Sequence, residues 1–157
     1  MQQKDIEYMR QALVLAEKAA SCGEVPVGAI VVRGDEVIGR GYNRRETDGS
    51  AIAHAEILAI EEACRVVGSW RLNGCTLYVT LEPCPMCTGA IVNARLERVV
   101  FGVKDPVAGC CGSVLNVNRY PFSHVFSLTE GVCEEACAEI LQNFFKERRK
   151  EKGNMAQ

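Results

Sequence analysis

The chain has 157 residues and a formal net charge of −2, which favours one domain and excludes a broadly basic surface for nucleic acid. Its nine cysteines are an odd number and follow a polar start, so we expect a reducing, cytoplasmic environment without disulfides. No apolar run has the length of a bilayer span, and the sequence therefore predicts no membrane association.

The first elements of the chain are predicted to be a helix and a β-hairpin. Apolar residues recur at three- and four-residue spacings over 5–21, which is the period of an amphipathic helix. Two stretches rich in β-forming residues, 27–33 and 36–42, flank a turn at Gly34 and Asp35. Both stretches are therefore expected to pair as neighbouring strands.

The middle of the chain is predicted to contain a loop, a helix and a strand. Residues 43–49 are polar and are expected to form a loop. Ser50 is a candidate cap for a helix over 52–67, and Gly68 is expected to end that helix. Residues 75–81 then form a predicted strand.

The rest of the chain continues the alternation of helices and strands. A helix over 85–95 is followed by a continuously apolar strand over 98–103, as expected in a sheet covered on both faces. After a glycine-containing loop, we expect a short strand over 124–128 and a closing helix over 132–150. Residues 153–157 are expected to be a frayed tail. This order predicts one α/β domain over the whole chain, with helices on both faces of a mixed sheet.

Two short clusters hold the residue types that bind zinc. Cys84 and Cys87 are three residues apart at the start of a predicted helix, so both sulfur atoms can lie on one face. His54, near the start of the preceding helix, would supply a third ligand. Three protein ligands leave one tetrahedral position for water, which is the arrangement of a catalytic zinc site.

Glu56 is the candidate for proton transfer at this site. A carboxylate beside the metal-bound water can take its proton and deliver it to a substrate. Residues two apart on a regular helix do not share a face, however. His54 and Glu56 can therefore serve one site only if the first helical turn is irregular or if the glutamate reaches across.

Each motif alone has a structural explanation, such as an incidental cysteine pair or a histidine that caps a helix. The combination of His-x-Glu, a strand and Pro-Cys-x-x-Cys at the next helix is the pattern of zinc-dependent nucleobase deaminases. A structural zinc site with four ligands would need one more residue. Cys110 and Cys111, in the loop after the 98–103 strand, are available for it.

Longer segments resemble the bacterial tRNA-specific adenosine deaminase family over nearly the whole chain. The similar segments are 24–29, 41–43, 53–56, 77–87, 99–102, Asp105, Gly109, 112–113, 130–131 and 144–149. The resemblance implies a cytidine-deaminase-like three-layer α/β/α sandwich around a mixed five-stranded sheet. It also implies a homodimer with one Zn²⁺ per subunit. The implied reaction is zinc-dependent hydrolytic deamination of adenosine to inosine at the wobble position of a tRNA anticodon, in bacteria usually that of an arginine tRNA.

The same resemblance implies further contacts with the substrate. Asn43 would hydrogen-bond the edge of the base, Val27 would form an apolar wall, and the backbones of Ala55 and Glu82 would complete the contacts. Asp105 is expected near the target ribose, where it would help to read the 2′-hydroxyl. Without the resemblance, a turn role is the favoured interpretation of Asn43, and a core role is the default interpretation of Val27.

A basic cluster near the carboxyl end has two explanations. Arg148, Arg149 and Lys150 are either contacts with RNA phosphates or a solvated helix end that complements the helix dipole. Residues 118–121 are also expected to border the RNA.

Two other functions stay open. A deaminase of free nucleobases or nucleosides, such as guanine or cytosine, would have the same metal site. A non-catalytic zinc module that binds RNA or a partner protein would have no use for Glu56.

Overall fold

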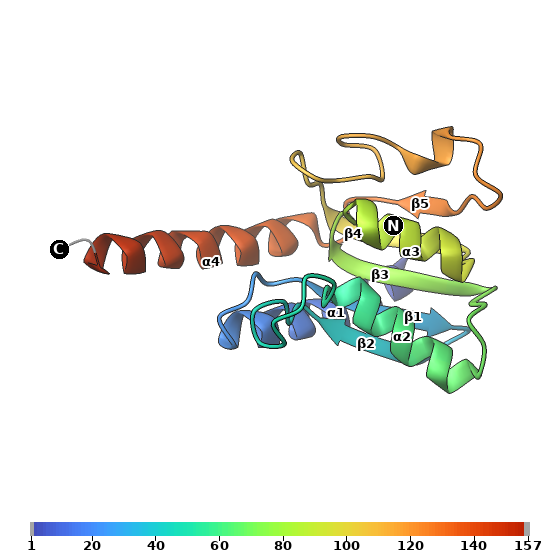
Figure 1. The fold of residues 1–157 in the computed structure, drawn as a ribbon, viewed down its shortest axis with the longest axis horizontal. Coiled ribbons are helices and arrows are strands. Elements are labelled where there is room, and N and C mark those ends of the chain that lie inside the picture. Colours follow the sequence, from blue (N-terminus) through green and yellow to red (C-terminus); the bar gives the residue numbers. More distant parts are fainter. Residues whose placement is uncertain (1, 156–157) are drawn as a thin grey trace.

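A computed structural model describes residues 2–155 and places five strands in one sheet (Figure 1). The strands are β1 (Gly28–Arg33), β2 (Glu36–Tyr42), β3 (Cys75–Leu81), β4 (Arg98–Val103) and β5 (Ser127–Thr129). Their spatial order is β2-β1-β3-β4-β5. Strand β1 is antiparallel to both of its neighbours, whereas β3, β4 and β5 run parallel to one another. The sheet is therefore mixed, as the sequence predicted.

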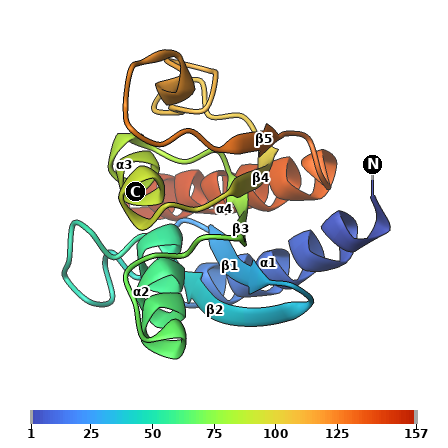
Figure 2. The same cartoon turned by 90° about the vertical axis from the view of Figure 1, so that its right-hand side faces the viewer.

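Within residues 2–155, two α-helices cover each face of this sheet (Figure 2). The helices are α1 (Gln3–Ser21), α2 (Ala55–Val67), α3 (Pro85–Ala94) and α4 (Glu134–Met155), together with the short 3₁₀ helix η1 (Val117–Arg119). Helices α1 and α4 pack against one face, around Ile30 and Val100. Helices α2 and α3 cover the other, around Val31, Leu77 and Val99. This three-layer α/β/α sandwich confirms the predicted fold class.

Close approach of α2 to the sheet depends on a glycine. A Cβ atom at Gly41 of β2 would lie 2.2 Å from the carbonyl oxygen of Ala55, in the first turn of α2. Only a residue without a side chain allows this distance. Gly41 therefore sets how deeply the start of α2, and the residues at its N-terminus, sit beside the sheet.

The ends of several elements meet at one edge of the sheet. Parallel strands β3 and β4 are joined through α3, so their carboxyl ends lie at the same edge. Helix α3 begins at Pro85, shortly after β3 ends at Leu81. Ligand sites of α/β proteins form at such edges.

Helix α2 begins later than the sequence indicated. Its first residue is Ala55 and its N-cap is His54, so the prediction of a start at 52 with a Ser50 cap was wrong. The Ser50 carbonyl instead accepts a hydrogen bond from the Ala53 amide within a loop of turns.

The predicted limits of the last two elements also need correction. Strand β5 begins at Ser127 instead of 124, because both backbone groups of Phe126 are hydrogen-bonded to the side chain of Asn118. Helix α4 cannot begin before Glu134, because Cys133 has a positive φ of 54°. It continues to Met155, so 153–155 are helical and not frayed, while 156–157 lie outside the described residues. No helix in the described part combines the length and apolarity needed to cross a bilayer.

Candidate active site

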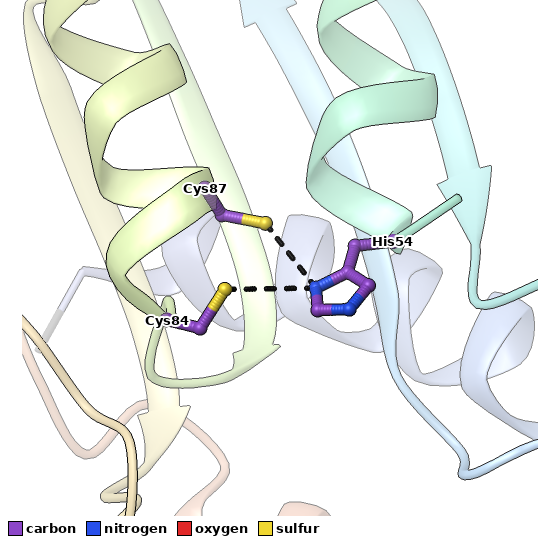
Figure 3. Close-up of side chains that lie close together, drawn as sticks. All are labelled: His54, Cys84 and Cys87. Atoms are coloured by element: carbon purple, nitrogen blue, oxygen red, sulfur yellow. Dashed lines mark hydrogen bonds between the residues drawn. The ribbon is translucent and has the colours of Figure 1, made fainter. Parts of the chain in front are cut away.

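The side chains of His54, Cys84 and Cys87 converge between the beginnings of α2 and α3 (Figure 3). His54 Nδ1 lies 3.6 Å from Cys84 Sγ and 3.5 Å from Cys87 Sγ. All three possible ligand atoms lie within 4.8 Å of one another. In a tetrahedral zinc site with typical bond lengths, nitrogen and sulfur ligands are separated by about 3.6 Å. The observed spacing therefore fits one metal ion held by all three residues.

Local structure at the start of α3 produces the cysteine geometry. Cys84 is the N-cap, with extended backbone angles of φ −76° and ψ 176°. Pro85 occupies the first helical position, where its missing N–H has no intrahelical partner in any case. Cys87 then lies in the first turn, and its sulfur returns to the side of Cys84.

His54 and Glu56 can reach one site because they do not belong to the same helical turn. The backbone of His54 is extended, with φ −80° and ψ 153°, and α2 begins only at the next residue. Glu56 is 4% exposed and lines the same pocket as His54 and Cys84. Burial raises the pKa of the Glu56 carboxyl, which favours its protonated form.

The electrostatics of the cluster favour a cysteine thiolate. Hydrogen bonding with Cys87, and then with His54, lowers the pKa of Cys84 to about 4. Cys84 also caps the N-terminus of α3, where the helix dipole favours negative charge. Thiolate is the form of cysteine that binds metal ions, so the site is prepared for a cation.

A pocket of about 340 Å³ lies beside these groups. All five residues that were predicted to contact substrate line it: Val27, Asn43, Ala55, Glu82 and Asp105. Its volume is at the lower end of the range of about 300–1,000 Å³ for small-molecule sites. The pocket is therefore suited to one small group.

Two of these lining residues also serve the fold. Val27 is buried in the core cluster between the sheet and α2 and α3, so its core role and its pocket role coexist. The Asn43 side-chain amide donates to the Val25 carbonyl at 3.1 Å and accepts from the Arg45 amide at 3.1 Å. Asn43 therefore has a fixed orientation at the pocket wall before any ligand arrives.

Asp105 lies at the pocket edge in the loop after β4. Its Oδ1 accepts hydrogen bonds from the amides of Val107 at 3.0 Å and Ala108 at 3.3 Å. Only one carboxylate oxygen is thus used by the loop. The Asp105 amide itself donates to the Glu82 carboxylate at 3.1 Å.

The structure brings one of the three predicted basic residues to the pocket. Arg148 lines its mouth, with the guanidinium 5.2 Å from the centre of the Phe144 ring. Arg149 and Lys150 are exposed and lie outside the pocket lining, and Lys150 is 3.6 Å from Glu147. Residues 118–121 do not line the pocket either.

Neither cysteine of the Cys110-Cys111 pair extends the metal cluster. Among residues 2–155, the group of side chains that could hold a metal consists of His54, Cys84 and Cys87. Cys110 and Cys111 are buried, and burial raises the pKa of both thiols. The four-ligand alternative thus gains no support from their positions.

Two features of the pocket were not predicted from the sequence. They are the presence of Glu24 in its lining and the hydrogen bonds of the Glu82 side chain. Glu24 is almost fully buried and lines the pocket, although no metal or base role was expected of it. Glu82 was expected to contribute only its backbone, yet its carboxylate is buried and hydrogen-bonded to a neighbouring loop. The sequence feature that could have indicated both residues is an acidic residue directly beside a buried apolar segment.

Comparisons with known proteins agree with this geometry. The family model of the MafB19-like deaminases matches residues 3–149. A Bacillus subtilis (strain 168) protein named tRNA-specific adenosine deaminase is 51% identical over 150 residues, which is 95% of this chain and 93% of that protein.

Two solved structures are also similar to this chain. One, from studies of A-to-I editing by tRNA:A34 deaminases at the wobble position of transfer RNA, has a TM-score of 0.84 and 42% identity, covering 86% of this chain and 99% of that chain. Another, a guanine deaminase from Bacillus subtilis, has a TM-score of 0.61 and 37% identity, covering 66% of each chain.

Proposed function

This chain belongs to the tRNA-specific adenosine deaminase family, and we propose that it hydrolyses adenosine to inosine at the wobble position of a tRNA anticodon. An arginine tRNA is the expected substrate. The observation that carries the proposal is the pocket in which a buried glutamate lies beside a His-Cys-Cys cluster. A purely structural metal site has no need of such a carboxylate.

His54, Cys84 and Cys87 are proposed to hold one Zn²⁺ per subunit. Two soft cysteine sulfurs and one imidazole suit zinc, and the distances between them fit its tetrahedral geometry. When bound, zinc lowers the pKa of a water molecule so that hydroxide is available near neutral pH.

Glu56 is the proposed proton carrier. Water adds its oxygen to C6 of adenine, and the amino group leaves as ammonia. Glu56 takes a proton from the water and delivers it to ring nitrogen N1, and a second transfer through Glu56 goes to the departing amine. A carboxyl whose pKa is raised by burial can hold a proton between these transfers.

Pocket residues are proposed to hold the base in reach of Glu56. Asn43 would bind the base edge with its remaining hydrogen-bonding capacity, Val27 would contact the ring face, and the backbones of Ala55 and Glu82 would complete the contacts. A pocket of this size requires the base to leave the stack, which an anticodon loop permits at little cost.

Two further residues are proposed to bind the nucleotide outside the base. Asp105 has one carboxylate oxygen available for the ribose 2′-hydroxyl. Arg148 at the pocket mouth would contact a phosphate, and Arg149 and Lys150 would add to the positive charge along α4.

We propose that the protein acts as a homodimer. Large apolar side chains are exposed on the loop between β4 and β5, at Val114, Tyr120, Phe122 and Val125. This loop and α3 border an apolar groove. Exposed apolar patches of this kind are typical of protein interfaces, and the resemblance to a dimeric family supports this one.

The second candidate is deamination of free bases, which the similarity to a guanine deaminase favours. Ammonia release from an anticodon stem-loop, compared with release from free adenine, guanine, cytosine and their nucleosides, separates these functions. We expect release from the stem-loop with kcat/KM at least about 100-fold above that for any free base, which corresponds to about 2.7 kcal/mol. A preference for a free base would contradict the proposal. A folded, zinc-loaded protein without activity on any of them would instead favour a binding module.

A further inference from the structure

Two buried carboxylates of the pocket have no part in the proposed proton transfer. Glu24, between α1 and β1, is 1% exposed, and Glu82, directly after β3, is 2% exposed. Both line the pocket, and neither belongs to the group of possible metal ligands. A buried carboxylate is costly unless hydrogen bonds compensate its lost hydration. Their hydrogen-bond partners therefore indicate what they do.

Glu24 binds the loop that joins β2 to α2. Its Oε1 accepts from the Glu46 amide at 3.0 Å, and its Oε2 accepts from the Thr47 amide at 2.7 Å and the Thr47 hydroxyl at 2.6 Å. This loop begins at Asn43 and ends at His54, two residues of the pocket wall. Glu24 thus fixes the loop that forms the first wall of the pocket.

Glu82 binds the loop after β4 in the same way. Its carboxylate accepts from the amides of Asp105 at 3.1 Å, Cys111 at 3.0 Å and Ser113 at 3.1 Å, and also from the Ser113 hydroxyl. The pocket-lining residues Asp105 and Ala108 belong to this loop. Glu82 thus fixes the second wall.

The contact of Glu82 with its loop leaves no space for a side chain at Gly109. A Cβ atom there would lie 2.3 Å from the carboxyl carbon of Glu82. Both carboxylates accept almost entirely from backbone amides and hydroxyls of their loops. A glutamine of the same size would turn an N–H group toward some of these donors, so only the carboxylate can accept from all of them.

We propose that Glu24 and Glu82 are positioning residues that hold the two loops of the pocket in the substrate-binding arrangement before the nucleotide enters. The substrate in this inference rests on the proposed function, whereas the loop anchoring does not. Neither residue touches the reacting atoms. Without these two residues, the nucleotide would have to order both loops when it binds, and that ordering would weaken binding.

Kinetics of Glu24→Gln and Glu82→Gln on an anticodon stem-loop test this proposal. We expect each substitution to raise KM by about 10-fold, since each loosens one wall, with the zinc content unchanged. A residue that serves only global stability would lower the active fraction, and hence the apparent kcat, without changing KM. Unchanged KM values in both variants would overturn the proposal.

Asp5→Asn is the matched control. Asp5 is also a buried carboxylate, 3% exposed, but it binds Arg98 and Tyr78 away from the pocket. This substitution is expected to lower the melting temperature and leave KM unchanged. An equal rise of KM in Asp5→Asn would show that any buried carboxylate has this effect, which would overturn the assignment.

Milder substitutions keep the proposal testable if a glutamine variant does not fold. Thr47→Val and Ser113→Ala each remove one hydroxyl donor, and we expect a KM increase of about 3-fold from each. Gly109→Ala displaces the Glu82 carboxylate and is expected to act like Glu82→Gln.

Amide hydrogen exchange gives a readout that needs no substrate. We expect the Thr47 amide to exchange at least about 10-fold faster in Glu24→Gln, and the Cys111 and Ser113 amides in Glu82→Gln, with no change in Asp5→Asn. If the wild-type protein does not act on the stem-loop, the proposed function fails while this experiment still tests the anchoring. Unchanged exchange in both variants would overturn the inference itself.

Discussion

The backbone conformation of one residue decides whether this site can work. His54 is the N-cap of α2 and has an extended backbone, whereas Glu56 lies in the first helical turn. Both side chains consequently line one pocket, although a two-residue spacing within a helix would separate them. The N-cap position also leaves the imidazole free to direct Nδ1 at the two sulfur atoms (Figure 3).

Replacement of Glu56 by glutamine is predicted to abolish most activity without loss of the metal. Glutamine fills the same space but cannot carry the proton, so we expect kcat to fall by roughly 10²- to 10⁴-fold. Bound zinc, measured by atomic absorption, should remain at one ion per subunit because Glu56 is not a proposed ligand. Near-normal turnover by this variant would remove Glu56 from the mechanism.

Asp105→Asn is predicted to relax the preference for RNA over DNA. Asparagine keeps an oxygen that can accept from the Val107 and Ala108 amides, so the loop should retain its shape. The side-chain NH2 group of the asparagine would replace the carboxylate oxygen of Asp105 that is available for the 2′-hydroxyl. The measurement is the ratio of kcat/KM for stem-loops with ribose and with deoxyribose at the target, and we expect it to fall by about 10-fold, or 1.4 kcal/mol. An unaltered ratio would separate Asp105 from the ribose.

The sequence pointed to the three residues of the His-Cys-Cys cluster more directly than to the residues that support the pocket. Zinc accepts few residue types at few spacings, so His54, Cys84 and Cys87 could be chosen from motifs alone. Glu24 could not, because its partners lie 22 and 23 residues further along the chain in a loop without periodicity. Such a contact becomes visible only when the chain is folded.

At the scale of elements, α4 is the helix that reaches from the core to the pocket mouth. Its beginning packs against β4 and α1, and its later part runs past the end of the sheet (Figure 1). Arg148 lies on the side of α4 that lines the pocket, whereas Lys150 is turned to Glu147. One basic residue of the cluster therefore lies beside the pocket, and another lies on the solvated surface.

Arg148→Ala is predicted to weaken the binding of an anticodon stem-loop and to reduce its salt dependence. Loss of one phosphate contact should lower the slope of log Kd against log salt concentration by about 1. Lys150→Ala is the matched control, since it removes the same charge from the same helix but away from the pocket, and we expect a smaller change. A slope that is identical in wild type and in Arg148→Ala would favour the solvated-end interpretation.

Element order was more predictable than element limits. Periodicity and turn residues located the helices and strands in chain order, because those patterns reflect burial within each element. The start of β5 depends instead on the hydrogen bonds of Asn118 to Phe126, and the start of α4 follows the positive φ of Cys133. Local patterns contain no record of these contacts.

In the whole molecule, the ion pair of Asp5 and Arg98 connects helix α1 to three strands of the sheet. Asp5 of α1 accepts two hydrogen bonds from Arg98 of β4, at 2.9 and 2.8 Å, and one from Tyr78 of β3 at 2.8 Å. Arg98 also donates to Thr129 of β5 at 2.9 Å. This network lies away from the pocket and ties α1 to the centre of the sheet.

The stability of the protein is predicted to fall in acid through Asp5. Hydrogen bonding to Arg98 lowers the pKa of Asp5 below its ordinary value of 3.8. The native state therefore holds fewer protons on this group than the unfolded state, so its contribution is complete above pH 3.8 and is lost as the pH falls through the lowered pKa. Urea unfolding at neutral pH should show Asp5→Asn to be less stable by about 3 kcal/mol, because Arg98 is left unpaired. The difference should shrink in acid, and a difference independent of pH would contradict this role.

Editing of a tRNA anticodon by this protein can be measured on natural tRNA. The zinc-loaded protein is incubated with total tRNA, which is then sequenced, with Glu56→Gln as the control. Because inosine is read as guanosine, we predict A-to-G changes at the wobble position of an anticodon that begins with adenosine, and none with the variant. Total tRNA that stays unchanged after treatment with folded, zinc-loaded protein would contradict the proposed function.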